Sequence, residues 1–138
     1  MIGDGPEKES LEQEIKKRKI GNCRILGRCS EEEKMQAYAA CDVFLHPTKY
    51  DAYGITLIEA MAQGKPVLAS HVGGIPSVVG LEGLTFKEDD REDLKRKLKK
   101  LLDSKKLRDE LGRRARKKVE GMTWEKITAQ LTKVYRSL

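Results

Sequence analysis

The chain has 138 residues, of which 36% are charged and 38% hydrophobic, a balance typical of a folded globular domain and not of a disordered one. Its net charge of +6 is unevenly placed: residues 1–90 carry 11 Lys/Arg against 15 Asp/Glu, and residues 91–138 carry 17 against 7. No apolar run approaches the roughly 18 residues of a membrane span, and the chain does not start like a signal peptide. We therefore expect a cytoplasmic protein with one domain over residues 1–138.

The basic segment after residue 90 has two interpretations. It can be the solvated side of amphipathic helices, or it can attach the protein peripherally to an anionic membrane surface. Both interpretations stay open from the sequence.

The first half of the chain alternates helix and strand signals. Charged residues at 7–19 predict an exposed helix, acidic at its start and basic at its end. A short strand is predicted at 23–26. Ser30 and Glu33 form a capping box that predicts a helix through about Cys41. Residues 42–46 are apolar at their centre, which is typical of a strand covered on both faces.

Residues 50–66 predict a loop followed by a helix. Gly54 opens this helix, Gly64 closes it, and Pro66 prevents it from continuing. A third strand is predicted at 66–70, and it is followed by Gly73-Gly74 and a short helix at 75–79. Residues 83–86 predict a fourth, shorter strand.

From Asp90 onward the pattern is helical only, with three helices over residues 90–138. Strands that alternate with helices predict an α/β fold, a Rossmann-like parallel sheet with flanking helices. Ligands of such sheets bind beyond the carboxyl ends of the strands, which is where Asp51, Gly54 and Gly73-Gly74 fall.

The start of the helix after Gly54 has the chemistry of an anion site. The free N–H groups of Tyr53 to Thr56 would point out of its positive end, where a phosphate or diphosphate can bind. Asp51 and Glu59 flank that end, and carboxylates accept hydrogen bonds from sugar hydroxyls. A diphosphate between two hydroxylated groups is a nucleotide sugar. The alternative is a buried helix in which Glu59 has no ligand.

The two histidines have open roles. His46 ends a predicted strand near the mouth of the site, so it is either a polar contact there or a structural histidine, and the same choice holds for His71. No Ser/His/Asp or Cys/His arrangement supports a hydrolase. We expect no metal site, because Cys23, Cys29 and Cys41 are odd in number and lack Cys-x-x-Cys spacing, and we expect no cofactor.

Several motifs match one family in order and spacing. They are Gly3-Asp4-Gly5-Pro6, Gly27-Arg28, residues 38–47, residues 54–62, Gly64-Lys65-Pro66-Val67, Val72-Gly73-Gly74-Ile75-Pro76 and Trp124-Glu125-Lys126. With them the chain resembles the C-terminal, donor-binding domain of retaining GT-B glycosyltransferases, the glycosyl transferases group 1 (family 4-like). The resemblance covers nearly the whole chain.

The resemblance implies roles for the candidate site residues. Two family carboxylates separated by seven residues fall on Asp51 and Glu59, where Glu59 would hold the ribose and Asp51 the transferred sugar. The implied donor-binding residues are Arg28 beside the nucleobase, Tyr53, Gly54, Ile55 and Thr56 on the diphosphate and sugar, and Gly73 and Gly74. The sequence departs from the family pattern at Asp51, where Glu is usual, at His71, where Asp is usual, and at Ser77, where Glu is usual.

The resemblance also implies a function, which is retaining hexosyl transfer from a UDP-, GDP- or ADP-linked sugar without a metal ion. In the family, a loop with a phosphate-binding Arg and Lys and an acceptor-binding domain precede the part that matches this chain. We therefore expect a partial donor domain that is inactive alone and needs an acceptor domain or a partner chain. The alternative is a non-catalytic module that binds a nucleotide sugar or pairs with a subunit. No nucleic-acid partner is expected.

The sheet order implied by the family is 3-2-1-4-5-6, in which the central first strand would precede Met1 and Met1-Ile2 would be a stub of the second strand. The strands at 23–26 and 42–46 would then present unpaired edges, which proteins do not normally leave open. We therefore expect the isolated chain to self-associate or to be poorly stable.

Overall fold

The computed structural model describes residues 1–137. The chain forms two compact units, Met1–Ala37 and Tyr38–Leu138. One helix, α2, crosses the boundary between them. The single domain over residues 1–138, with the helices at 90–138 included, stays a prediction.

The first unit contains α1 (Lys8–Lys17) and the start of α2 (Glu31–Ala40). Helix α1 has no buried residue, as its charge pattern predicts. The capping box of α2 is confirmed, because the Ser30 N–H donates to Glu33 Oε2 at 2.7 Å and the Glu33 N–H donates to Ser30 Oγ at 3.1 Å. These two bonds satisfy backbone donors that the first turn of a helix otherwise leaves unpaired.

The predicted strand at 23–26 is wrong. The amino group of Met1 donates to Arg24 O at 2.6 Å and the Leu26 N–H donates to Met1 O at 2.9 Å, so the two segments lie side by side. The Gly3 N–H then donates to Gly27 O at 2.8 Å, which breaks the regular ladder. Such a short and irregular pairing does not make a strand.

The second unit contains a parallel sheet of three strands, β1 (Phe44–His46), β2 (Val67–Ser70) and β3 (Leu84–Phe86), in the order β1-β2-β3. The strands predicted at 42–46, 66–70 and 83–86 are confirmed with shorter bounds. All four residues of the central strand β2 are buried, as expected for a strand covered on both faces. The predicted Rossmann-like α/β fold is therefore confirmed.

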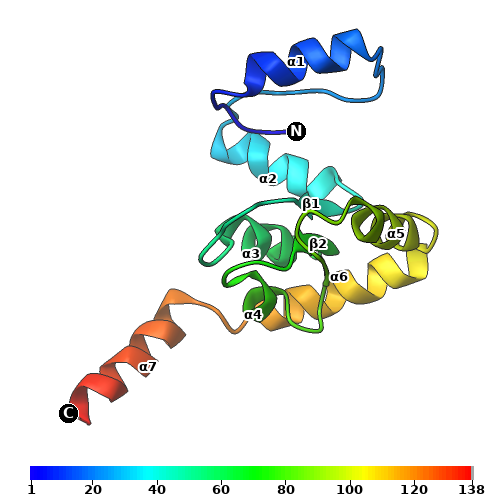
Figure 1. The fold of residues 1–138 in the computed structure, drawn as a ribbon. Coiled ribbons are helices and arrows are strands. Elements are labelled where there is room, and N and C mark those ends of the chain that lie inside the picture. The colour runs from blue at the N-terminus through cyan, green and yellow to red at the C-terminus, as the bar shows by residue number, and fades with distance from the viewer. Residues whose placement is uncertain (138) are drawn as a thin grey trace. The chain divides into compact units, whose positions relative to one another are not determined.

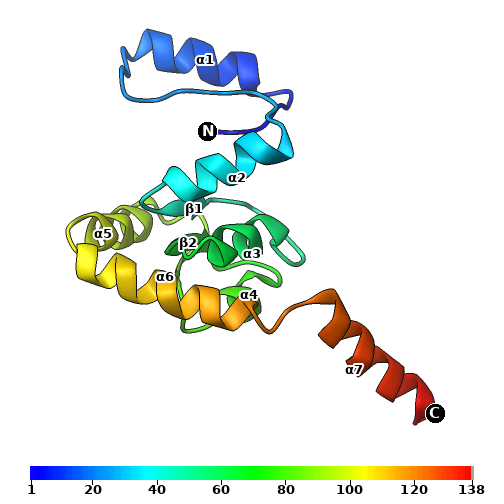
Figure 2. The same ribbon diagram turned by 180° about the vertical axis from the view of Figure 1, so that it is seen from behind.

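Helices cover both faces of the sheet. Helices α3 (Ile55–Ala62) and α4 (Ile75–Val79) contact β2 from one face. Helices α5 (Arg91–Leu102) and α6 (Lys105–Val119) enclose a core cluster on the other face, made of Leu68, Phe86, Leu101 and Leu111. Both ribbon views place α6 alongside α3 and α5 (Figures 1 and 2). Helix α3 therefore contacts α6, α4 and the sheet.

The last helix, α7 (Trp124–Arg136), has Thr123 as its N-cap, and the Thr123 hydroxyl accepts from the Lys126 N–H at 3.4 Å. None of its residues is buried. Apolar side chains recur at helical spacing along it and are exposed; they are Trp124, Ile127, Leu131 and Val134. Among residues 1–137 no helix is both long and apolar enough to cross a membrane.

Candidate functional site

The start of α3 lies beyond the carboxyl end of β1, and the loop over residues 47–54 joins the two. Gly54 has a positive φ of 74°, and a Cβ on it would lie 2.7 Å from Ile75 Cδ1 and 2.9 Å from Leu57 Cδ1. The position therefore needs glycine for both its conformation and its space. This close approach seats the first turn of α3 against α4.

Asp51 is the centre of the loop. Its Oδ1 accepts from the N–H groups of Tyr53 at 3.0 Å and Gly54 at 2.7 Å, and its Oδ2 lies 3.0 Å from His46 Nε2. The Tyr53 N–H, with help from His46 and Gly54, holds the pKa of Asp51 below its ordinary value against the opposing effect of partial burial. Asp51 is therefore a carboxylate, and His46 Nε2 must carry the proton of their bond, since a carboxylate only accepts.

This arrangement changes the expected anion site. Tyr53 and Gly54 give their N–H groups to Asp51, because a short Asp side chain folds back onto the backbone two and three residues later. In the described part of the chain, the N–H groups of Ile55 and Thr56 find no acceptor. The buried Thr56 Oγ1 also has no hydrogen-bond partner there. The end of α3 that can bind an anion is therefore Ile55 and Thr56.

Glu59 is half-buried on α3, one turn after Ile55. Its Oε2 accepts from the Tyr38 hydroxyl at 2.9 Å, and Tyr38 is buried in the last turn of α2. Sequence reasoning missed this role of Tyr38. No periodic pattern links two side chains 21 residues apart, so only the fold could reveal the contact.

Gly73 and Gly74 follow β2 and pack against the Asp51 loop. The Gly74 N–H donates to Asp51 O at 3.1 Å. A Cβ on Gly73 would overlap Asp51 O, and a Cβ on Gly74 would overlap Ala52 O, so both positions need glycine. The structure thus gives both glycines a packing role, and their contact with a donor stays a prediction.

Arg28 belongs to the first unit, Met1–Ala37. Its Nε lies 3.9 Å from Asp4 Oδ2 and its side chain is exposed. Its predicted place beside a nucleobase stays a prediction.

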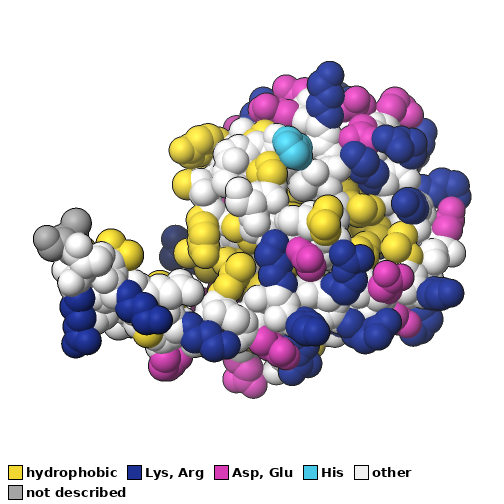
Figure 3. Space-filling model, turned by 90° about the horizontal axis from the view of Figure 1, so that it is seen from below, with side chains coloured by type: hydrophobic (Ala, Val, Ile, Leu, Met, Phe, Trp, Pro, Cys, Tyr) yellow, Lys and Arg dark blue, Asp and Glu magenta, His cyan; other side chains and the backbone are white. Residues whose placement is uncertain are grey.

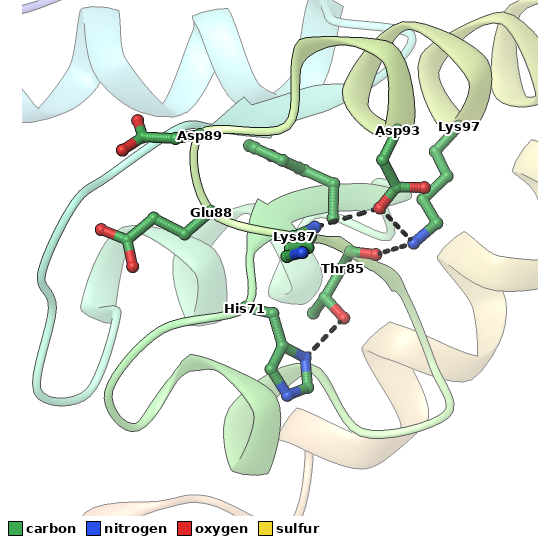
Figure 4. A pocket seen from close by; sticks show the side chains of 8 residues that line it. His71, Thr85, Lys87, Glu88, Asp89, Asp93 and Lys97 are labelled. Atoms are coloured by element: carbon green, nitrogen blue, oxygen red, sulfur yellow. Dashed lines mark hydrogen bonds and ion pairs between the residues drawn. The ribbon is translucent and has the colours of Figure 1, made fainter.

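A cavity of about 530 Å³ lies between the end of β3 and α5 (Figure 4). Its side chains bond one another: His71 Nδ1 lies 3.0 Å from Thr85 Oγ1, and Lys97 Nζ donates to Thr85 O at 2.7 Å and Asp93 Oδ2 at 2.8 Å. Asp93 Oδ2 also accepts from the Lys87 N–H at 3.0 Å. The network fastens the loop after β3 to α5. Apart from His71, whose role the sequence left open, none of the candidate site residues lines the cavity.

Within residues 1–137, no group of three or more His, Cys, Asp or Glu side chains is placed to hold a metal ion. The charged groups at the start of α3 are instead the carboxylates of Asp51 and Glu59.

The profile of the family described as Glycosyl transferases group 1 matches residues 1–118. The chain belongs to this family. It is 37% identical over 137 residues to the sulfoquinovosyl transferase of Arabidopsis thaliana, and this covers 95% of the chain and 26% of that protein. It is also 32% identical to the N-acetyl-alpha-D-glucosaminyl L-malate synthase of Bacillus anthracis, which covers 98% of the chain and 36% of that protein.

Solved structures confirm the fold. Sucrose-phosphate synthase from Thermosynechococcus elongatus superimposes with a TM-score of 0.85 and 28% identity, over 99% of the chain and 37% of that structure. The Anabaena protein HepE, solved with UDP and glucose, superimposes with a TM-score of 0.83 and 24% identity, over 99% of the chain and 40% of that structure. The chain thus spans about a quarter to two-fifths of these proteins.

Proposed function

We propose that the chain is the donor-binding part of a glycosyltransferase that binds a nucleoside diphosphate sugar across the start of α3. The diphosphate would accept hydrogen bonds from the N–H groups of Ile55 and Thr56. Glu59 would accept from the ribose hydroxyls, and Asp51 would accept from hydroxyls of the sugar. In the whole enzyme this donor would serve the transfer of a hexosyl group with retention of anomeric configuration.

The observation that carries the proposal is the pair of unpaired N–H groups at Ile55 and Thr56. These groups sit at the positive end of α3, where the helix dipole favours an anion. Asp51 and Glu59 would repel a phosphate, so an anion binds most favourably at the N–H groups. Hydroxyls bind most favourably at the carboxylates, to which they can donate hydrogen bonds. A diphosphate linked on both sides to hydroxylated rings meets both demands.

The comparisons support the chemical class of the donor. Relatives of this chain have names of glycosyltransferases, and HepE was solved with UDP-glucose. The choice among UDP-, GDP- and ADP-linked sugars is part of the proposal, as are retention and the need for an acceptor domain.

The anionic-membrane surface stays a prediction that rests on α5 and α6. Their carboxylates pair with cations of the same helices, such as Glu92 with Lys95 and Asp109 with Lys105. In the described residues, Lys106 and Lys117 have no carboxylate within ion-pair distance. The face drawn in Figure 3 shows Lys and Arg side chains interleaved with Asp and Glu.

Calorimetric titration of the chain with UDP, GDP, ADP and their sugars tests the proposed donor. We expect one nucleotide series to bind, and Glu59→Ala to weaken it by about 1–3 kcal/mol, because the ribose hydroxyls lose a charged acceptor. A 2′,3′-dideoxy form of the same nucleotide should bind Glu59→Ala and the unchanged chain with equal affinity.

The matched control is Glu110→Ala, an exposed Glu on α6 that pairs with Arg114. It should bind like the unchanged chain. Equal affinity of Glu59→Ala with its fold intact would remove the ribose role. If no nucleotide binds the unchanged chain, the alternative of a module that only pairs with a subunit gains support and the proposed function is wrong.

A further inference from the structure

We propose that Tyr38, Phe44 and His46 form an aromatic row that positions both carboxylates of the site. In this row Tyr38 holds Glu59, His46 holds Asp51, and Phe44 packs between the two aromatic rings. Tyr38 and His46 are then positioning residues that act through the carboxylates, and the ribose and sugar ends of the site become coupled. The inference rests on the proposed function.

The first end of the row is Tyr38. Its side chain is 6% exposed, and its hydroxyl donates to Glu59 Oε2 at 2.9 Å. A half-buried carboxylate is costly unless it is hydrogen-bonded, so this bond gives Glu59 Oε2 a partner and restricts the rotamer of the side chain. The contact joins α2 to α3.

The second end is His46. Its Nε2 lies 3.0 Å from Asp51 Oδ2, while Asp51 Oδ1 is held by the Tyr53 and Gly54 N–H groups. Both oxygens of Asp51 are therefore fixed, one by the backbone and one by His46. A carboxylate oxygen has two lone-pair positions, so Oδ2 keeps one for a ligand hydroxyl in a direction that His46 sets.

Phe44 joins the two ends. Its ring lies 5.3 Å from the Tyr38 ring at 78°, edge to face, and 6.1 Å from the His46 ring at 18°, nearly parallel. Phe44 and His46 are two residues apart on β1, so they lie on one face of the sheet. β1 pairs Phe44 with Val67 and His46 with Ala69, both fully buried. The row is thus supported by the central strand.

This arrangement matters because the donor is a long molecule. The ribose and the sugar lie on opposite sides of the diphosphate, so the spacing of their two carboxylates limits which donors fit both at once. A row that fixes this spacing before binding lowers the entropy cost of ordering two side chains. For a donor that contacts both carboxylates at once, the effects of changes at the two ends of the row should therefore be non-additive.

The test uses variants that each change one part of the row. Tyr38→Phe and His46→Phe remove one polar donor each, and Phe44→Leu removes the middle ring but leaves both donors. Tyr50→Phe is the control, because Tyr50 is 78% exposed in the same loop. The affinities of all four for the nucleoside diphosphate, its dideoxy form and its sugar conjugate are measured by calorimetry.

We expect Tyr38→Phe to weaken binding of the nucleoside diphosphate about three- to tenfold, with no loss for the dideoxy form. His46→Phe should weaken binding of the sugar conjugate by a similar factor and leave the affinity for the bare nucleoside diphosphate unchanged. The effects of Tyr38→Phe and His46→Phe on the sugar conjugate should be non-additive, and Phe44→Leu should remove that coupling.

The outcomes separate the row from the proposed function. If Glu59→Ala weakens binding but Tyr38→Phe and His46→Phe bind like the unchanged chain, the row is wrong and the function stands. Equal losses for every ligand would also overturn the row, because they would mean a general loss of structure. If nothing binds, the function fails, and urea unfolding of Tyr38→Phe, Glu59→Gln and the double variant decides whether these two side chains are coupled; additive effects would refute the row.

Discussion

The carboxylate of Asp51 accepts hydrogen bonds from backbone N–H groups at the start of α3, so these groups are not free to bind an anion. The carboxylate accepts from the N–H groups of Tyr53 and Gly54, the two residues just before α3, and His46 holds its other oxygen. A helix start that carries its own carboxylate has less positive charge left for a phosphate. The remaining N–H groups of Ile55 and Thr56 are therefore the ones on which the proposed diphosphate contact depends.

Replacing Asp51 by Glu tests that arrangement. Glu is one methylene longer and cannot keep both the Tyr53 and the Gly54 bonds, so we expect a loss of stability of about 1 kcal/mol, typical of one lost hydrogen bond. We also expect a change in preference among sugars that exceeds any change in affinity for the bare diphosphate. Urea unfolding measures the stability change, and titration with several sugar conjugates measures the preference.

Asp51→Asn is the matched control, since it keeps the length and removes the charge. If Asp51→Glu changes the affinities for sugar conjugate and bare diphosphate by the same factor, Asp51 does not face the sugar.

At the scale of elements, contacts with neighbouring segments fix the position of the start of α3. Its start is seated by Gly54 against Ile75 of α4, and the Gly73-Gly74 loop packs on the backbone of Asp51 and Ala52. The first turn of α3 and the loop before it are therefore one rigid piece. A site whose donors are backbone N–H groups needs such rigidity, because those groups have no side-chain freedom with which to adapt.

Asp93 links the loop after β3 to α5 through its hydrogen bonds and ion pairs. Lys97, then the Lys87 N–H, lower the pKa of Asp93 from 3.8 to about 2. A folded-state pKa below the ordinary value means that the bond stabilises the fold above about pH 3.8 and loses this effect as the pH falls toward 2. We expect Asp93→Asn to be less stable than the unchanged chain at pH 7 and to lose less stability between pH 5 and pH 2.

Urea unfolding at several pH values measures this difference. Asp103→Asn serves as the control, because Asp103 is an exposed carboxylate near the end of the same helix that pairs with Lys99. Parallel stability curves for the unchanged chain and Asp93→Asn would show that Asp93 carries none of the acid sensitivity.

At the scale of the whole molecule, two surfaces expose apolar groups that proteins normally cover. β1 is an edge strand of the described sheet, and its Leu45 is 36% exposed. Helix α7 has Trp124 at 82% exposed and Leu131 at 53%. Contiguous apolar surface and open strand edges favour association.

We therefore expect the isolated chain to self-associate and to transfer no sugar by itself. Light scattering should give a mass above that of one chain, and Trp124→Gln combined with Leu131→Gln should lower it. Thr128→Gln on the same helix is the control. A stable monomer that turns over a nucleotide sugar unaided would contradict both expectations.

The sequence by itself determined the features that depend on neighbours along the chain. Periodicity predicted the helices and the strands of the second unit, and the Ser30–Glu33 capping box was visible because its bonds are local. The family and the positions of Asp51 and Glu59 followed from motif order. The strand at 23–26 was mispredicted, because a strand needs a long enough partner, and its only neighbour in the described first unit is the short segment at Met1 to Gly3.

Only the tertiary structure decided which groups of the site form hydrogen bonds within the protein. The contacts of Tyr38 with Glu59, of His46 with Asp51 and of Gly74 with the Asp51 loop join segments that the chain brings together by folding. The sequence treated the four N–H groups from Tyr53 to Thr56 as equivalent, and folding assigned two of them to Asp51. Hydrogen-bond partners depend on positions in space to within a few tenths of an ångström, and residue spacing alone carries no such information.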